Sequence, residues 1–161
     1  MATRNLSATD QLSIPDASGM RFGIAVADWN PEITGALLSG CVRTLCEHHV
    51  SEEDIEVLHV PGSFELPLAG QFLAEMGRFD AVILLGCVIQ GETRHFDYIC
   101  QGVTQGIMDL NLKFGFPFIF GILTTLDQQQ AADRAGGKHG NKGDEAAHTA
   151  IRMVAIRQNF R

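Results

Sequence analysis

The sequence predicts a three-layer α/β sandwich, in which helices cover both faces of a four-stranded parallel sheet and an N-terminal arm precedes the sheet. Short, near-continuous apolar runs are typical of strands that are buried on both faces. Segments with helical spacing of their apolar residues alternate with these runs and are long enough to connect parallel strands. With 161 residues, of which 45% are hydrophobic and 19% charged, the chain fits one globular domain with its own core.

The start of the chain differs in composition from the rest. Residues 1–20 hold few consecutive apolar positions, so we expect an arm, with a short strand near residues 12–14, that is either disordered or docked on a neighbouring subunit. Residues 21–161 are expected to form the single domain. No basic segment followed by an apolar stretch begins the chain, so we predict no signal peptide and a cytoplasmic location.

Charge and cysteine content exclude several classes of function. The formal net charge of −7 argues against general nucleic-acid binding, and no apolar run reaches membrane-spanning length. The histidines have no spacing with cysteines or acids that indicates a metal site. The cysteines form no Cys-x-x-Cys pair, so we expect free thiols of a cytosolic protein at Cys41, Cys46, Cys87 and Cys100.

The first half of the domain contains two strand–helix units. Arg21–Asp28 is an apolar run typical of a buried strand, and Glu32–His49 carries its apolar residues at helical spacing after a proline that suits a first turn. Ile55–Val60 is the second predicted strand. A Pro-Gly turn follows it, and Ser63 can cap a helix over Phe64–Met76.

The second half continues the same alternation and ends with two helices around a glycine-rich break. The predicted strands are Asp80–Ile89 and Phe116–Leu123, the predicted helices are Phe96–Phe114, Thr124–Arg134 and Asp144–Asn159, and the break is Gly136–Gly143.

An open parallel sheet binds its ligands beyond the carboxyl ends of its strands. Polar and aromatic residues follow each predicted strand at this edge. Topology is therefore expected to bring Trp29, Phe64, Glu65, Glu92, Thr93, His95 and Phe120 towards one crevice.

The turn Gly91–His95 joins the third strand to the third helix and predicts an anion site. The first amides of a helix lack internal partners, and the helix dipole favours negative charge there. Thr93 is a candidate N-cap. His95 then falls in the first turn, where its side chain can move a proton near neutral pH.

Several of these residues also have a purely structural interpretation. Trp29, the only tryptophan, is either a core or interface aromatic or a stacking surface for a planar heterocycle. Arg134 and Lys142 are either solvated charges or a phosphate clamp. The glycine-rich Gly136–Gly143 does not fit a Walker A loop, because no strand precedes it and no Ser or Thr follows its lysine.

Four motifs in their order and spacing resemble the 6,7-dimethyl-8-ribityllumazine synthase family over about residues 21–160. They are Val60–Pro67 (VPGSFELP), Gly86–Tyr98 (GCVIQGETRHFDY), Phe120–Thr125 (FGILTT) and Asn141–Ala147 (NKGDEAA). The resemblance implies a flavodoxin-like fold. It also implies condensation of 5-amino-6-(D-ribitylamino)uracil with 3,4-dihydroxy-2-butanone 4-phosphate, a step of riboflavin biosynthesis, without a cofactor or metal.

The resemblance assigns roles to residues that would hold the uracil substrate. An aromatic stacks on the pyrimidine ring, a second segment holds the ribityl chain, and a third lies along the pyrimidine edge. In this chain the stacking aromatic is Trp29. The segment that holds the ribityl chain is Ser63, Phe64 and Glu65, and the segment along the pyrimidine edge is Cys87, Val88 and Ile89.

The same resemblance assigns residues to proton transfer and to the phosphate. His95 matches the catalytic proton-transfer residue, and Glu92 and Thr93 match the turn on the phosphate side. Phe120 matches an aromatic wall and Arg134 a phosphate-binding arginine, both given by the neighbouring subunit. Lys142 and Glu145 match a polar pair nearby.

The family forms pentamers, and the short segment between Arg134 and Gly143 resembles that of members that build a hollow icosahedral shell of twelve pentamers. Riboflavin synthase is a further expected partner. Three alternatives remain open: a non-catalytic relative that binds a lumazine or flavin, a structural shell protein, and a flavodoxin-like electron carrier. Retention of both His95 and Arg134 argues against a pure binder.

Overall fold

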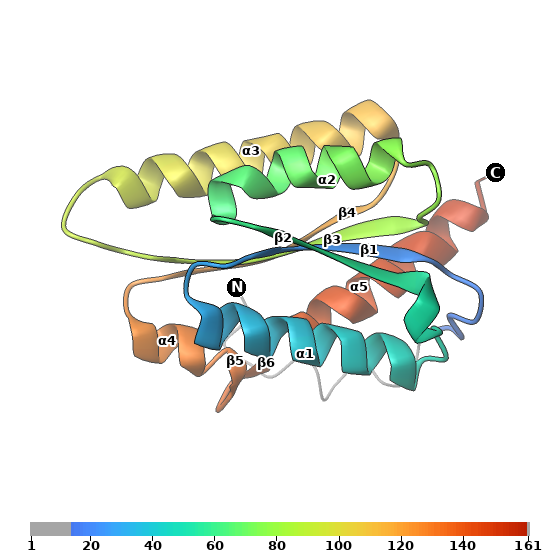
Figure 1. Cartoon of the computed structure of the whole chain (residues 1–161), viewed down its shortest axis with the longest axis horizontal. Helices are drawn as coiled ribbons and strands as arrows, with labels where there is room; N and C mark the ends of the chain where they lie inside the picture. Colours follow the sequence, from blue (N-terminus) through green and yellow to red (C-terminus); the bar gives the residue numbers. More distant parts are fainter. Residues whose placement is uncertain (1–13, 161) are drawn as a thin grey trace.

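A computed structural model of the chain describes residues 14–160 and confirms the predicted fold class (Figure 1). Its central sheet contains four parallel strands in the order β2-β1-β3-β4. The strands are β1 (Phe22–Ala27), β2 (Ile55–Val60), β3 (Ala81–Ile89) and β4 (Phe118–Thr125). Because all strands run in the same direction, their carboxyl ends share one edge of the sheet, at the left in Figure 1.

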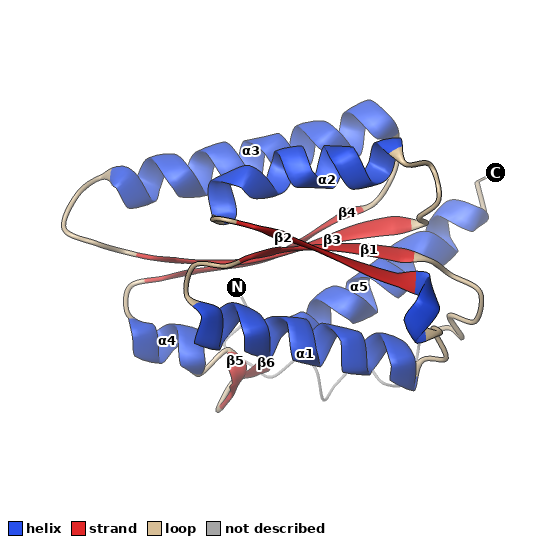
Figure 2. Ribbon diagram, viewed as in Figure 1, coloured by secondary structure: helices blue, strands red, loops and turns tan. Residues whose placement is uncertain are grey.

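Helices cover both faces of this sheet (Figure 2). One face carries α2 (Leu66–Glu75) and α3 (His95–Phe114), and the other carries α1 (Pro31–Glu47), α4 (Gln128–Ala132) and α5 (Lys142–Gln158). A short 3₁₀ turn, Glu52–Asp54, precedes β2. Among the described residues, none of the helices combines the length and the apolar character that crossing a membrane would need.

The two central strands explain the near-continuous apolar runs in the sequence. All six residues of β1 and the first seven of β3 are buried. Alternate residues of β1 enter different cores: Phe22, Ile24 and Val26 pack on the α1 side, whereas Ala25 and Ala27 pack on the α2 side. The outer strand β2 has no buried residue, as expected for the edge of an open sheet, whereas six of the eight residues of β4 are buried.

The boundary between the fourth strand and the next helix differs from the prediction. β4 begins after Pro117, which has no N–H to donate, and continues through Thr124 and Thr125, which pair with the end of β3. The helix predicted to start at Thr124 begins only at Gln128. Asp127 caps it, because its side chain accepts a hydrogen bond from the Gln130 amide at 2.7 Å.

The glycine-rich break forms a small antiparallel ladder that the sequence did not predict. Its strands are β5 (Ala135–Gly137) and β6 (Gly140–Asn141), and Gly136 and Gly140 have φ values of 107° and 76° that favour glycine. The final helix then starts at Lys142, two residues before the predicted start. The Asn141 side chain caps it by accepting from the Gly143 amide at 2.8 Å.

The described part of the arm packs on its own domain. Ala17 and Met20 are buried, and the Ala17 amide donates to the carbonyl of His48 at the end of α1 at 3.0 Å. The strand predicted near residues 12–14 falls mostly outside the described residues, and Ile14 is not in a strand. Docking of the arm on a neighbouring subunit stays a prediction for residues 1–13.

Candidate active site

The turns after β1 and β2 form one continuous unit at the carboxyl edge. The amides of Asp28 and Trp29 donate to the carbonyls of Val60 and Pro61 at 2.8 and 3.1 Å, so backbone hydrogen bonds join the two turns just beyond the paired strands. The Trp29 ring lies against Gly62, where a Cβ atom would come within 2.6 Å of the ring. Trp29 is nevertheless 66% exposed. It therefore presents a free aromatic face, as stacking on a planar ring requires.

Asn30 is a positioning residue that the sequence analysis missed. Its backbone is left-handed, with φ 61° and ψ 55°, and its carbonyl accepts the first amide hydrogen bonds of α1. Its side-chain amide donates to the carbonyl of Cys87 at 3.1 Å. Asn30 thus ties the Trp29 turn to the end of β3. The sequence feature that could have indicated this role is an asparagine directly before a helix-starting proline, because Asn adopts the left-handed backbone conformation more readily than most residues.

The segment after Gly62 differs from the predicted cap and exposes an acceptor for hydroxyl groups. Ser63–Glu65 is a 3₁₀ turn, and α2 starts only at Leu66. Glu65, rather than Ser63, makes the cap, because its Oε2 accepts from the Gly62 amide at 3.1 Å. Among the described residues the buried Ser63 hydroxyl has no hydrogen-bond partner. A carboxylate and an unpaired hydroxyl suit a polyhydroxylated ligand.

Cys87, Val88 and Ile89 end β3 next to this unit. The Cys87 side chain is buried, and burial raises the pKa of its thiol to about 11. The thiol is therefore neutral near pH 7 and does not act as a nucleophile. Val88 and Ile89 are half-buried and pair with the end of β4. The three residues offer an apolar and backbone surface rather than a reactive group.

The loop after β3 carries the predicted proton-transfer residue. Glu92, Thr93 and His95 are all exposed, and this loop forms the far left of the molecule in Figure 1. Helix α3 begins at His95 with Arg94 at the N-cap position, so Thr93 is not the N-cap residue. Its hydroxyl still accepts from the His95 amide at 3.4 Å. The start of α3 is thus open to an anion, and His95 lies beside it.

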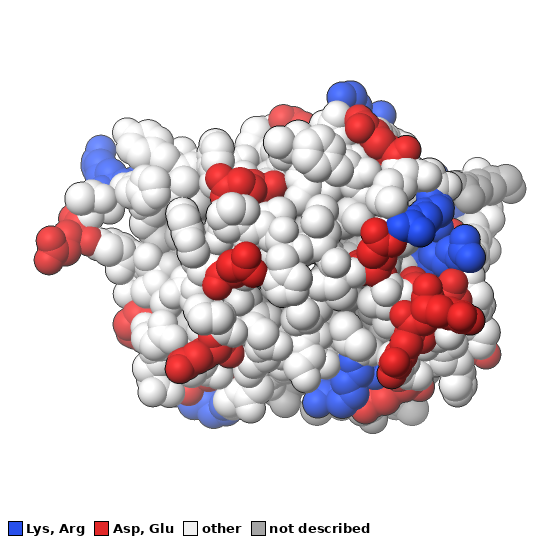
Figure 3. Space-filling model, viewed as in Figure 1, with Lys and Arg blue, Asp and Glu red and all other residues white. Residues whose placement is uncertain are grey.

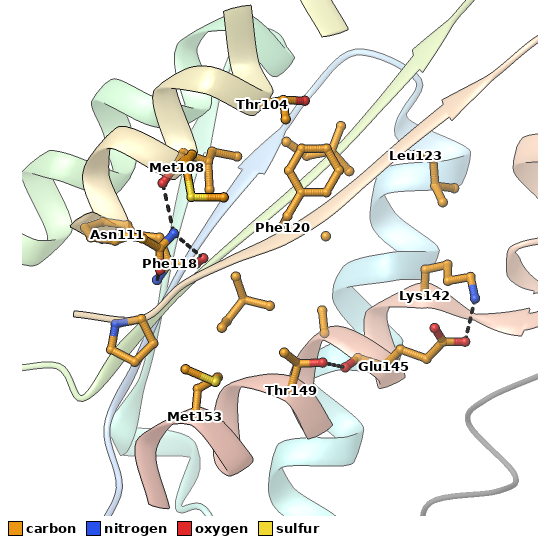
Figure 4. Close-up of a pocket in the computed structure, with 16 residues that line it drawn as sticks. Thr104, Met108, Asn111, Phe118, Phe120, Leu123, Lys142, Glu145, Thr149 and Met153 are labelled. Atoms are coloured by element: carbon orange, nitrogen blue, oxygen red, sulfur yellow. Dashed lines mark hydrogen bonds and ion pairs between the residues drawn. The ribbon is translucent and has the colours of Figure 1, made fainter. Parts of the chain in front are cut away.

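Phe120 does not lie in the crevice with Trp29, which corrects the expectation from topology. It lies within β4 and pairs with Leu84, well before the carboxyl ends of β3 and β4. Phe120 lines a groove of about 690 Å³ along the outer side of β4, between α3 and α5 (Figure 4). Lys142 and Glu145 line the same groove and form an ion pair at 2.6 Å.

Arg134 lies at the β4 side of the molecule, after α4. One of its terminal nitrogens donates to the Gln130 carbonyl at 2.9 Å, and its Nε is buried without a partner among the described residues. No acidic side chain within residues 14–160 forms an ion pair with it. The adjacent Asp133 pairs with Lys138 at 3.0 Å instead. A hydrogen bond from Gln129 and the contact with Lys138 lower the pKa of Asp133.

The candidate side chains therefore fall into two separate sets within one chain. Trp29, Ser63 and Glu65 lie at the ends of β1 and β2, whereas Phe120, Lys142 and Glu145 line the opposite, β4 side of the sheet. Among the described residues no group of three or more His, Cys, Asp and Glu side chains could hold a metal ion.

The fold defines a flavodoxin-like α/β protein, and its candidate site residues lie on two sides of the parallel sheet. A model of the 6,7-dimethyl-8-ribityllumazine synthase family matches residues 19–158. The chain belongs to this family.

Curated relatives of this name match nearly the whole chain. The lumazine synthase of Parabacteroides distasonis is 60% identical over 153 residues, which cover 95% of this chain and 96% of the relative. Those of Porphyromonas gingivalis and Cytophaga hutchinsonii are each 56% identical, over 155 and 154 residues, and each match covers 96% of both chains. The resemblance drawn from the four motifs is thereby confirmed.

Proposed function

We propose that the chain condenses 5-amino-6-(D-ribitylamino)uracil with 3,4-dihydroxy-2-butanone 4-phosphate to give 6,7-dimethyl-8-ribityllumazine, phosphate and water. The observation that carries this proposal is the match to enzymes of this name over nearly the whole chain. An exposed aromatic at Trp29 and an arginine, Arg134, that forms no ion pair within residues 14–160 agree with it. The amine attacks the ketone and loses water to form an imine. Phosphate then leaves by elimination, and a second loss of water accompanies ring closure.

The uracil substrate binds at the turns after β1 and β2. Its ring stacks on the exposed face of Trp29, and its edge lies along Cys87, Val88 and Ile89. The Glu65 carboxylate and the Ser63 hydroxyl bind the ribityl chain, beside Phe64. Support comes from the close packing of Trp29 on Gly62 and from the half-buried Glu65 carboxylate, which bonds to the Gly62 amide beside it.

The phosphate substrate binds between the start of α3 and a cationic group. Arg134 offers a planar fork that no carboxylate among the described residues occupies, and Thr93 and Glu92 shape the turn that precedes α3. His95 moves protons during imine formation and elimination, which general acid–base catalysis accelerates by roughly 10²–10⁴-fold. Lys142 and Glu145 form a polar pair near the aromatic wall of Phe120.

The two sets of side chains meet only if neighbouring copies share the site. Helix α2 and the turn before it carry an exposed apolar stripe at four-residue spacing: Phe64, Leu68, Phe72 and Met76. Figure 3 views the side of the molecule where β2 and α2 lie, and Lys and Arg occur there only near its margins. The groove along β4 is a different, also largely apolar surface on the opposite side.

Two different contact surfaces on opposite sides of one chain favour a head-to-tail ring over a two-fold dimer. We propose the pentamer of the family, with the stripe of one copy next to the β4 groove of another, and a shell of twelve pentamers. All four cysteines are free, which supports the cytoplasm as the location. Riboflavin synthase, which would consume the product, is the proposed partner. Sedimentation as a lone pentamer would rule out the shell.

Formation of the lumazine by the purified protein tests the proposal. We expect a saturable fluorescence signal above the uncatalysed background. The variant Arg134→Ala should raise KM for the phosphate substrate about ten- to a hundredfold, because a hydrogen bond to a charged group contributes about 1.5–3 kcal/mol. Lys138→Ala removes a nearby cation that already pairs with Asp133 and is the matched control. No turnover by a folded, assembled protein would point instead to a non-catalytic lumazine or flavin binder.

A further inference from the structure

A side-chain bridge joins the two turns that hold Trp29 and Glu65. Nδ1 of His59 lies 2.8 Å from Oδ1 of Asp28. His59 is the next-to-last residue of β2, and Asp28 directly follows β1. Each turn thus carries one end of the bridge within a few residues of a proposed substrate-binding group.

The His59 end of the bridge lies on the α1 face of the sheet, because His59 pairs with Val26, whose side chain packs on that side. Strict alternation ends beyond β1, since the consecutive amides of Asp28 and Trp29 both donate to the segment at the end of β2. The Trp29 ring contacts Gly62, whereas the Asp28 and His59 side chains bond to each other. The pair can therefore act on the stacking surface through the backbone of the two turns.

The exposure of the His59 and Asp28 side chains limits the effect of their bridge on global stability. The two side chains are 59% and 58% exposed, and exposed ion pairs add little to global stability because water screens them. Their local effect is different. The two turns are also joined by two backbone hydrogen bonds, from Asp28 to Val60 and from Trp29 to Pro61. The Trp29 ring contacts Gly62 as well. A side-chain bond beside them restricts the relative movement of the two turns.

We propose that Asp28 and His59 are positioning residues that fix the Trp29 turn against the Gly62–Glu65 turn and so set the affinity for the pyrimidine and ribityl groups of the uracil substrate. This proposal rests on the proposed function for the identity of the ligand. It assigns the bridge no contact with the reacting atoms and no part in phosphate binding.

The same two strands offer a matched control at their other ends. Arg21, just before β1, has its Nε 3.1 Å from Oδ1 of Asp54, just before β2. Arg21→Ala removes a bridge between the same elements, at the amino edge and far from the carboxyl-edge turns. His59→Asn retains a donor close to the Nδ1 position, whereas His59→Leu and Asp28→Ala break the bond.

The test measures the affinity of each variant for 5-amino-6-(D-ribitylamino)uracil from quenching of Trp29, the only tryptophan, and KM for both substrates. His59→Leu and Asp28→Ala should each weaken uracil binding about three- to fivefold, with the double variant no worse than either, while KM for the phosphate substrate stays constant. Arg21→Ala and His59→Asn should bind as the wild type does. Fluorescence anisotropy of the ligand-free protein should show a more mobile Trp29 only in the two bridge-breaking variants.

Unchanged uracil affinity in both bridge-breaking variants, or an equal loss in Arg21→Ala, would overturn the proposal. Equal losses for His59→Asn and His59→Leu would overturn the hydrogen-bond explanation. The binding measurement also separates this proposal from the proposed function. A wild-type protein that binds the uracil without forming the lumazine would contradict the enzymatic function. The role of the bridge would still be tested by the uracil affinities of the same variants.

Discussion

His95 is the proton-transfer residue of the proposed reaction, and its exposed position limits how much we expect it to contribute. It is the first residue of α3, and its side chain is exposed among the described residues. Both reactants are already reactive, so positioning supplies a large share of the acceleration. Removal of His95 should therefore slow the reaction without stopping it.

We predict that His95→Ala lowers kcat roughly 10²-fold or more and leaves uracil affinity, measured by Trp29 quenching, nearly unchanged. His49→Asn is the control, because His49 is an exposed histidine at the far end of α1 with a positive φ that Asn tolerates. Complete loss of turnover with intact binding would show that His95 does more than transfer protons.

The sequence identified single residues best where a motif fixed their neighbours. Trp29 and Glu65 were predicted at the carboxyl edge, and the structure places them there in contact with Gly62. Asn30 was missed because its role depends on a left-handed backbone and on a bond to Cys87, a residue distant in sequence. The capping role of Glu65 was also not predicted, because serine is a more common N-cap residue than glutamate and Ser63 was chosen instead.

At the scale of elements, α1 and the start of α5 approach each other closely at Gly143. A Cβ atom at Gly143 would come within 1.9 Å of the Leu37 carbonyl oxygen, so only glycine allows this approach. Arg43 and Asp144 add an ion pair at 2.8 Å across the same crossing. Helix α5 also carries Lys142 and Glu145, so this crossing positions one side of the proposed site.

Gly143→Ala should therefore lower the free energy of unfolding by about 1–3 kcal/mol, because α1 and α5 must move apart. Urea denaturation followed by circular dichroism measures this change. Gly35→Ala is the matched control: it lies in α1, where an added Cβ atom would meet nothing within 4 Å, and it should be neutral or stabilise by at most about 1 kcal/mol. Equal midpoints for Gly143→Ala and the wild type would contradict the packing explanation.

Element types were predictable from periodicity, whereas several boundaries were not. Thr124 and Thr125 were assigned to a helix, but pairing with β3 keeps them extended, which is a tertiary effect that no local pattern reveals. The β5–β6 ladder was missed because strands of three and two residues are too short to show alternation.

At the scale of the whole molecule, the central feature is that the proposed substrate-binding residues lie on opposite sides of one sheet. Parallel topology correctly placed Trp29 and Glu65 at the carboxyl edge. The prediction that Phe120 lies in the same crevice was wrong, because Phe120 lies within β4 and lines the β4 groove. A site shared between copies accounts for both placements, and the exposed apolar stripe on α2 supplies a surface for that contact.

Complementation between two defective variants tests this account most directly. Trp29→Ala damages the half-site for the uracil ring, and Arg134→Ala damages the half-site for the phosphate. Each variant alone should form lumazine slowly, and sedimentation should show that each assembles as the wild type does. When the two are unfolded and reassembled together in equal amounts, about a quarter of the shared sites should combine two intact halves. We predict that activity then rises well above the mean of the separate variants, towards a quarter of the wild-type rate. Activity equal to that mean, in an assembly shown to contain both variants, would contradict a site shared between neighbouring copies.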